Sequence, residues 1–201
     1  MSASVPETRF ERPRAIETAK RFVGLIDDAC ARLVVAGSLR RRLALIGDVE
    51  IVAVPKVARQ TVDLLGDVVV PHDLLDARLS ELLASGVVTK RLDRRGVPRW
   101  GRTLKYLLFD GMPIDLFAPE SPDRFGWILL LRTGPAAFSR QLVLPKGQKT
   151  KDGRAGLLPP HVVPRDGWLT ERTSGYRIPT PDEQDAFAAL GLAYRAPWER
   201  S

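Results

Sequence analysis

The sequence predicts an α/β (α+β) fold in which a mixed, largely antiparallel sheet is flanked by helices and followed by a small C-terminal domain. Residues 48–54 alternate between polar and apolar side chains, as a half-buried strand does. The apolar runs 103–109 and 112–117 are joined by Asp110-Gly111, a pair that favours a tight hairpin. Apolar stripes of helical spacing precede and follow the first of these strands, which indicates helices packed on the sheet.

The elements are justified in chain order by their local signals. Pro13 is tolerated in the first turn of a helix, an apolar stripe of helical spacing follows it from Ile16, and the helix is expected to end near Cys30. A buried strand, 32–36, is ended by Gly37-Ser38, and a helix is expected to begin at Leu39. The later expected elements are a short strand within 61–70, a helix over 72–85 ended by Gly86, strands over 87–92, 103–109 and 112–117, and helices over 121–131 and 180–190, the last with Thr180 as N-cap.

Composition divides the chain into three expected parts. Residues 1–12 are polar and predict a flexible arm, residues 13–119 hold the predicted sheet, and residues 120–201 form the small C-terminal domain. Eleven of the sixteen prolines lie between Pro113 and Pro197, which sets the last part off from the rest. Within it, residues 145–164 show little periodicity.

Charge and composition restrict the class of protein. Lys and Arg number 31 and Asp and Glu 24, so the net charge is +7, which favours a polyanionic partner. A single cysteine excludes an internal disulfide framework, and two histidines leave little for a His-rich metal site. No apolar run approaches the length that spans a bilayer, and the N-terminus does not resemble a secretory signal. We therefore expect a cytoplasmic, monomeric protein without a membrane partner.

Three acidic positions predict metal chemistry. Asp48 and Glu50 are two residues apart on one predicted strand, so their carboxylates should share a face. Asp115 lies between Ile114 and Leu116 and should point away from both. Three converging carboxylates repel one another unless a divalent cation lies between them, and Mg²⁺ or Mn²⁺ prefers such oxygen ligands. Two such ions can promote phosphoryl transfer, whereas strand carboxylates that simply face solvent are the alternative interpretation.

The segment before these carboxylates predicts a phosphate site. Gly37-Ser38 stands at a strand-to-helix junction, where free backbone N–H groups bind anions. Arg41 and its neighbours add positive charge that can bind phosphate in a bidentate manner. Gly47-Asp48-Val49-Glu50 follows within about ten residues, and the combination is more specific than either motif alone.

Gly37-Ser38-Leu39-Arg40-Arg41 with Gly47-Asp48-Val49-Glu50-Ile51 resembles the nucleotidyltransferase signature of X-family DNA polymerases, the polymerase beta type. Three later segments strengthen the resemblance, which covers about residues 14–198. They are the strand Pro113-Ile114-Asp115-Leu116, the Thr-Gly segment 131–139, and the closing helix with the ending Tyr194-Arg195-Ala196-Pro197.

The resemblance implies a role for each matching residue. Residues 13–119 would be a nucleotidyltransferase palm and residues 120–201 a thumb-like domain, as in minimal viral members, so a viral or phage origin is plausible. Asp48, Glu50 and Asp115 would be catalytic and would ligate two Mg²⁺ or Mn²⁺ ions. The other implied contacts are Gly37, Ser38, Arg41 and Gly47 on the triphosphate, Thr133, Gly134 and Ser139 around the sugar and base, and Arg140 on the template. Lys146, Lys149 and Lys151 form a basic loop that we expect to bind DNA phosphates.

The chain departs from the family pattern at several positions. Glu50 stands where the family has Asp, Ile46 where a phosphate-binding Ser is common, and Pro113 where an Arg usually supports the catalytic Asp. Leu131 and Arg132 replace an aromatic pair, and Ser139 replaces an Asn. The predicted function is a DNA-directed DNA polymerase that adds deoxynucleotides to a primer 3′ end in gap filling or short-patch repair. The alternatives are a catalytically impaired DNA-binding pseudo-polymerase and a nucleotidyltransferase acting on RNA or a small molecule.

Overall fold

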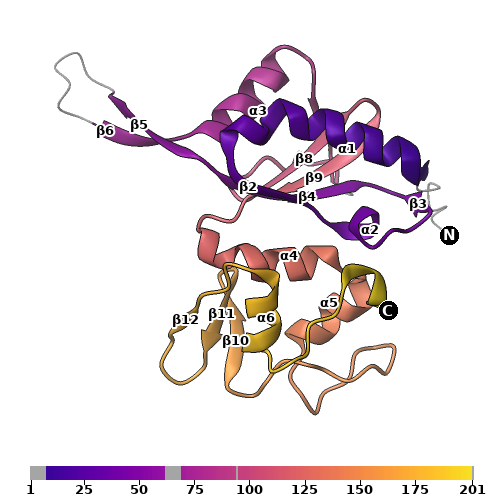
Figure 1. The fold of residues 1–201 in the computed structure, drawn as a ribbon, viewed down its shortest axis with the longest axis vertical. Coiled ribbons are helices and arrows are strands. Elements are labelled where there is room, and N and C mark those ends of the chain that lie inside the picture. The colour runs from indigo at the N-terminus through magenta and orange to yellow at the C-terminus, as the bar shows by residue number, and fades with distance from the viewer. Residues whose placement is uncertain (1–7, 62–68, 94, 201) are drawn as a thin grey trace.

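The computed structural model describes residues 8–61, 69–93 and 95–200 (Figure 1). Its helices are α1 (Arg12–Ile26), α2 (Gly37–Arg40), α3 (Leu74–Ala84), α4 (Phe125–Thr133), α5 (Ala136–Val143) and α6 (Glu183–Ala189). Its strands are β1 (Phe10–Glu11), β2 (Cys30–Val35), β3 (Leu45–Ile46), β4 (Val49–Pro55), β5 (Val57–Thr61), β6 (Val69–Asp73), β7 (Thr89–Lys90), β8 (Leu104–Phe109), β9 (Met112–Phe117), β10 (Val162–Arg165), β11 (Trp168–Glu171) and β12 (Arg177–Ile178).

A five-stranded mixed sheet is the centre of the fold, with strand order β2-β4-β9-β8-β7. β4 and β9 run parallel, and the other neighbouring pairs run antiparallel. Figure 1 shows α1 and α3 on one side of this sheet and α4 with the C-terminal elements on the other. The expected mixed α/β fold, with a mixed sheet flanked by helices, is therefore confirmed.

Alternation along β4 and β9 separates two hydrophobic clusters. Val49, Ile51, Ile114 and Leu116 belong to the cluster shared with α1 and α3. The intervening residues Val52, Val54 and Phe117 pack instead with Phe125 and Leu129 of α4. Glu50 and Asp115 have the same parity as this second set, so they face the side of the sheet that carries α4.

The C-terminal elements have their own cluster of buried side chains, formed by α4, α5, α6 and a three-stranded sheet of order β10-β11-β12. The proposed division at residues 119 and 120 remains a prediction, because the cluster around Phe125 joins α4 to the main sheet. No helix among the described residues is both long and apolar enough to cross a membrane.

Several element boundaries differ from those expected. The first helix ends at Ile26, and a 3₁₀ turn over Asp27–Ala29 continues it. α2 begins at Gly37 rather than Leu39 and is a single turn, which ends as Arg42 takes a φ of 66°. The strand expected over 87–92 is reduced to β7, and the strand expected within 61–70 lies mostly outside the described residues.

The C-terminal half contains the largest differences. The β10-β11-β12 sheet was not expected from the sequence. The final helix begins at Glu183 with Asp182 as its N-cap, and the Asp182 backbone N–H donates to the Asp185 carboxylate at 2.8 Å. Thr180, the expected cap, is buried instead, and its backbone N–H donates to the Asp123 carbonyl at 2.7 Å.

Candidate functional site

The register of the parallel pair brings two of the predicted acidic residues side by side. Glu50 of β4 is the direct partner of Asp115 on β9. Partners in adjacent strands have their side chains on the same face of the sheet, so both carboxylates point toward the side of α4. Asp48 stands just before β4, rather than within the strand as expected, and is half-buried.

The three carboxylates act on one another electrostatically. Burial, with the charges of Asp48 and Asp115 adding to it, raises the pKa of Glu50 to about 8. Burial likewise raises the pKa of Asp115 to about 6, because it outweighs the opposing effect of Arg91. At neutral pH the Glu50 carboxyl group therefore keeps its proton, and a cation that binds beside it would favour the charged form of the group.

The raised pKa of Glu50 predicts how the stability of the metal-free protein changes with pH. A carboxyl group whose pKa is raised by folding contributes stability that is full below its unfolded value, 4.5 for Glu50, and is lost as the pH rises through about 8. At about 1.4 kcal/mol per pKa unit, Glu50 accounts for about 3–5 kcal/mol. Urea unfolding in chelator from about pH 5 to about pH 9 should record this loss, and Glu50→Gln should remove most of it. If the free energy of unfolding depends on pH equally in wild type and in Glu50→Gln, Glu50 is not the group whose pKa is raised.

Arg91 is the ion-pair partner of Asp115. Its guanidinium also lies over the Tyr106 ring, with 4.6 Å between its central carbon and the ring centroid. Pro113 stands where the resemblance described above would place an arginine that supports Asp115. In the structure an arginine reaches Asp115 from the segment after β7, which the sequence analysis did not identify.

The predicted phosphate-binding segment lies directly beside Glu50. Gly37 has a φ of 65°, and a side chain there would collide with the Glu50 carboxylate, so both backbone and packing require glycine. The Ser38 hydroxyl is buried, and no group in the described part of the chain hydrogen-bonds to it. Burial lowers the pKa of Arg41, although Glu50 opposes that effect. Arg41 also donates to the Thr133 carbonyl, which connects α2 to the end of α4.

A cavity of about 440 Å³ contains most of the predicted nucleotide site. The predicted residues that line it are Ser38, Arg41, Gly47, Asp48, Glu50, Gly134, Ser139 and Arg140. Leu131 and Arg132 also line it, so the positions of the replaced aromatic pair do face the predicted site. Gly37 and Asp115 do not line this cavity, but Gly37 lies against the Glu50 side chain and Asp115 is the strand partner of Glu50.

Two residues expected around the sugar and base have other contacts. Thr133 is completely buried, and its hydroxyl accepts a hydrogen bond from Arg40 at 2.7 Å, so it does not line the cavity. The Ser139 hydroxyl donates to the Leu131 carbonyl at 2.7 Å. Gly134 lines the cavity with a φ of 67°, and a Cβ there would lie 2.9 Å from the Arg41 guanidinium.

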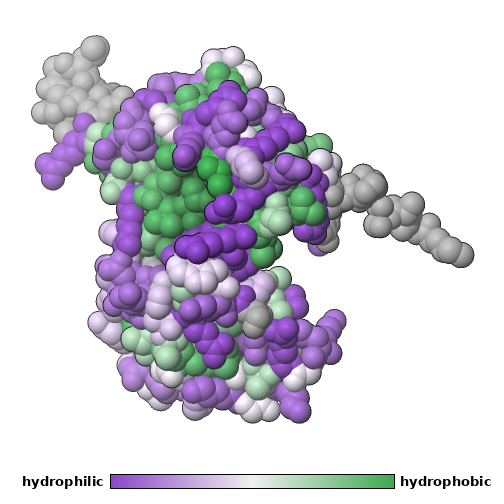
Figure 2. Space-filling view, turned by 45° about the vertical axis from the view of Figure 1, so that its right-hand side comes forward, coloured by the Kyte–Doolittle hydropathy of each residue, from purple (hydrophilic) through white to green (hydrophobic). Residues whose placement is uncertain are grey.

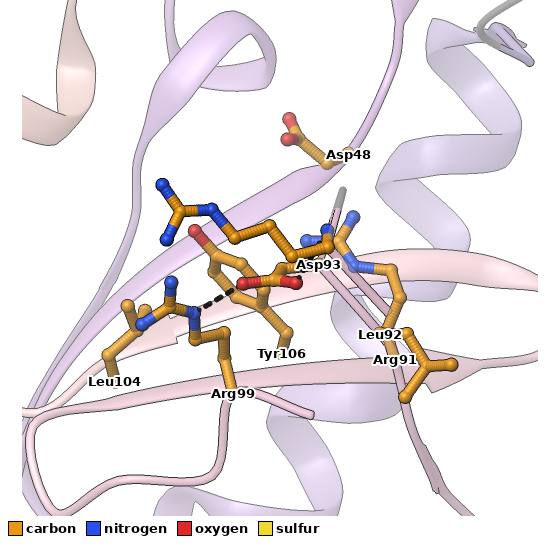
Figure 3. A pocket seen from close by; sticks show the side chains of 8 residues that line it. Asp48, Arg91, Leu92, Asp93, Arg99, Leu104 and Tyr106 are labelled. Carbon is orange, nitrogen blue, oxygen red and sulfur yellow. Dashed lines mark hydrogen bonds and ion pairs between the residues drawn. The ribbon is translucent and has the colours of Figure 1, made fainter. Parts of the chain in front are cut away.

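A second cavity, of about 730 Å³, also has Asp48 in its lining (Figure 3). Arg91, Arg95 and Arg99 line it together with Tyr106 and Asp93, and Arg99 pairs with Asp93 at 2.8 Å. Sequence reasoning missed these arginines as site residues. Their signal is the density of arginine between residues 91 and 102, where Arg91, Arg94, Arg95, Arg99 and Arg102 occur.

The predicted DNA-binding lysines are only partly associated with the site. Lys149 and Lys151 line a third cavity, of about 650 Å³, together with Arg140. Arg140 also lines the cavity that holds Glu50, so these two cavities adjoin. Lys146 is exposed and lines none of these cavities. Basic residues thus border all three cavities, which follow one another through Asp48 and Arg140.

A buried ionic network fixes α2 against the C-terminal elements. Arg40 donates to both Glu183 carboxylate oxygens, at 2.8 and 2.9 Å, and Arg200 donates to one of them at 2.8 Å. The Arg200 side chain is fully buried. Burial alone would raise the pKa of Glu183, but the hydrogen bonds from Arg200 and Arg40 outweigh it and lower that pKa. The sequence had indicated Arg40 as one of the basic residues beside the phosphate site, but nothing in it indicated Glu183 or Arg200 as its partners.

The comparisons with known proteins assign no family to this chain: no family model matches the sequence, and neither does any curated protein. Among the described residues, no group of three or more His, Cys, Asp or Glu side chains is placed to hold a metal ion.

Proposed function

We propose that the chain is a nucleotidyltransferase of the X-family DNA polymerase type, with residues 13–119 as its palm. The observation that carries the proposal is the parallel register that places Glu50 beside Asp115, with Asp48 close enough to raise both of their pKa values. The buried Ser38 hydroxyl and the Arg41 guanidinium border the same cavity, and they suit the phosphates of a nucleoside triphosphate.

The donor set suits hard divalent cations, although Arg91 pairs with one of its members. Carboxylate oxygens are the ligands that Mg²⁺ and Mn²⁺ prefer, and Asp48, Glu50 and Asp115 would hold the ions. When bound, the ions would supply positive charge to the transferring phosphoryl group. For Asp115 to take part, Arg91 has to exchange its carboxylate partner for another anion, and a nucleic-acid phosphate is the anion proposed.

Two cavities that share Asp48 as a lining residue would bind the two substrates, the triphosphate in one and the strand being extended in the other. Ser38, Arg41 and Gly134 bind and orient the triphosphate in the cavity of about 440 Å³. Arg95 and Arg99 bind phosphates of the strand being extended in the cavity of about 730 Å³. The primer 3′-hydroxyl oxygen attacks the α-phosphorus, and pyrophosphate leaves. Holding the reacting groups together in this way is itself a large source of rate enhancement.

A second candidate is a DNA-binding protein that does not polymerise. The Arg91–Asp115 ion pair favours it, because a carboxylate engaged by arginine is not available to a metal ion. The departures at Glu50, Ile46 and Pro113 point the same way. Under this candidate the three basic cavities still bind DNA, and only nucleotide transfer is lost.

Extension assays with different acceptors test the proposal and separate the candidates. The acceptors are a gapped DNA duplex, single-stranded DNA and an RNA primer, each with the four deoxynucleoside or ribonucleoside triphosphates and with Mg²⁺ or Mn²⁺. We expect DNA primers to be extended with deoxynucleotides, fastest at the gap. If only the RNA primer is extended, the chain is a nucleotidyltransferase that acts on RNA and the proposal is wrong. DNA binding without extension of any acceptor would establish the non-polymerising candidate.

DNA affinity should fall steeply as the salt concentration rises, and we expect the lysines of the third cavity to account for part of that dependence. The double variant Lys149→Glu, Lys151→Glu is expected to reduce the slope of log affinity against log salt by about 1–2, since each neutralised phosphate contributes about 0.9 on duplex DNA. Fluorescence anisotropy of a labelled gapped duplex over a range of salt concentrations measures it. Arg165→Glu, at an exposed position on β10, is the matched control and should leave the slope unchanged. An unchanged slope in the double variant would remove these lysines from the DNA contact.

A further inference from the structure

A separate groove of about 520 Å³ lies between α1, β2 and α2, with Trp198 of the C-terminal segment at its border. It shares no lining residue with the three basic cavities. Its floor is apolar: Ile16, Ala19 and Val23 come from α1, Leu33 and Val35 from β2, and Leu39 from α2. Figure 2 shows hydrophobic surface gathered between the upper and lower parts of the molecule, bordered by hydrophilic side chains. The proposed nucleotidyl transfer does not use this surface.

The floor of the groove is an open continuation of the main core. β2 is an edge strand of the five-stranded sheet, so its outer side pairs with no other strand among the described residues. Leu33 and Val35, two residues apart on β2, are only half-buried although they pack against the core cluster. A segment laid in the groove would complete their burial, at about 25 cal/mol for each Å² of apolar surface removed from water.

The charged residues of the groove all carry the same sign. Arg12, Lys20, Arg40 and Arg42 line it, and no acidic residue does. Arg40 is already engaged by Glu183, whereas Lys20 is exposed on α1. The buried Nε of Arg12 has no hydrogen-bond partner within the described ranges. The groove therefore offers positive charge around an apolar floor.

An aromatic anchor lies at the border of the groove. Trp198 is 53% exposed, and the central guanidinium carbon of Arg42 lies 3.9 Å from its ring centroid. Exposed tryptophan and arginine side chains beside an apolar depression are the residues that contribute most to protein–protein binding. An exposed indole that only stacks on arginine leaves much of its own apolar surface in water.

We propose that this groove binds an acidic segment of a partner protein, with the partner's apolar side chains on the floor and its carboxylates against Arg12, Lys20 and Arg42. Charge complementarity identifies the partner, because every charged lining residue is basic and the chain carries a net +7. That same charge repels a second copy of the chain. The phosphates of a nucleic acid could pair with the basic residues at the border of the groove, but its backbone would then place polar phosphates and sugars over the apolar floor.

Three fluorescein-labelled peptides of equal length test the proposal on the full chain by fluorescence anisotropy. One combines Glu with Leu and Phe, one replaces Glu by Lys, and one replaces Leu and Phe by Ser. We expect measurable binding of the first alone. Lys20→Glu should weaken it about tenfold or more, and Trp198→Ala about fivefold or more. Arg165→Glu, an equal charge reversal at an exposed position on β10, should leave it unchanged.

Each remaining outcome overturns the proposal in a defined way. Equal binding of the Lys peptide, or binding unaffected by Lys20→Glu, shows that charge complementarity does not select the partner. Displacement of the peptide by duplex DNA, with weaker DNA binding in Lys20→Glu, assigns the groove to nucleic acid. A dimer in light scattering that Lys20→Glu dissociates assigns it to a second copy of the chain. Circular dichroism of each variant confirms folding, and Lys20 is exposed, so its replacement disturbs no buried contact.

Discussion

Asp115→Asn is expected to reduce nucleotide addition to a DNA primer by at least about 10³-fold. The substitution keeps the size of the side chain but removes the charge that sits beside Glu50 in the parallel register. In the proposed reaction the carboxylates would hold the ions, which when bound would supply positive charge to the phosphoryl group. That contribution amounts to several kcal/mol, and each 1.36 kcal/mol is a factor of about ten in rate. Single-turnover extension of a gapped duplex measures it.

Asp110→Asn is the matched control for this variant. Asp110 lies on the same β8–β9 hairpin, is exposed and pairs with Arg21 at the surface. It has a φ of 55°, which Asn adopts readily, so the same substitution there should leave both fold and rate unchanged. Asp115→Asn should also keep its DNA affinity, because Arg91 is released from an ion pair. Activity of Asp115→Asn within about tenfold of wild type would remove Asp115 from the reaction.

Glu183→Ala is expected to destabilise the fold by about 3–5 kcal/mol, because it leaves the buried guanidinium of Arg200 without its counterion. Arg40 loses the same partner, so the contact between α2 and α6 is broken as well. Chemical denaturation at neutral pH measures the free energy of unfolding. Since hydrogen bonds lower the pKa of Glu183, its contribution is present above the ordinary value of 4.5 and is lost as the pH falls through the lowered one.

The surface pair Arg78–Glu81 provides the comparison for the buried network. Its atoms are 3.4 Å apart, and 73% of the Glu81 side chain is exposed. Exposed pairs contribute about 0–1 kcal/mol, so Glu81→Ala should change stability by no more than that. If Glu183→Ala costs no more than Glu81→Ala, the network does not hold α2 against the C-terminal elements.

Local turn chemistry explains which parts of the fold the sequence predicts. Asp110-Gly111 was identified as a hairpin, and its φ values of 55° and 72° are those that such a turn requires. Asp166-Gly167 joins β10 to β11 with φ values of 50° and 76°, so this second hairpin, which we did not expect, carries the same local signal as Asp110-Gly111. Pro164 and strands of only four residues weaken the alternation around it. The start of α6 was misplaced because Thr180 makes a long-range contact to Asp123 in place of a cap.

In the candidate site, too, the features that depend on local sequence could be predicted, and the contacts between distant segments could not. The alternation along β9 predicts that Asp115 lies on one face of the sheet while Ile114 and Leu116 lie on the other, and the structure confirms this arrangement. The pairing of Asp115 with Arg91 depends on how the chain returns through β7 and β8, so no spacing in the sequence indicates it. Glu183 and Arg200 meet Arg40 only after the C-terminal elements pack against α2. Metal binding, nucleotide binding and the division into domains remain predictions.

Transfer of a single α-labelled deoxynucleotide to a gapped DNA primer by the wild-type chain tests the proposed polymerase function most directly. With Mg²⁺ or Mn²⁺ we expect a primer longer by one nucleotide and an equal amount of pyrophosphate. We expect neither product in chelator, nor with Asp48→Asn. A folded wild-type chain that binds the gapped duplex but transfers no nucleotide with either cation would contradict the proposed polymerase function.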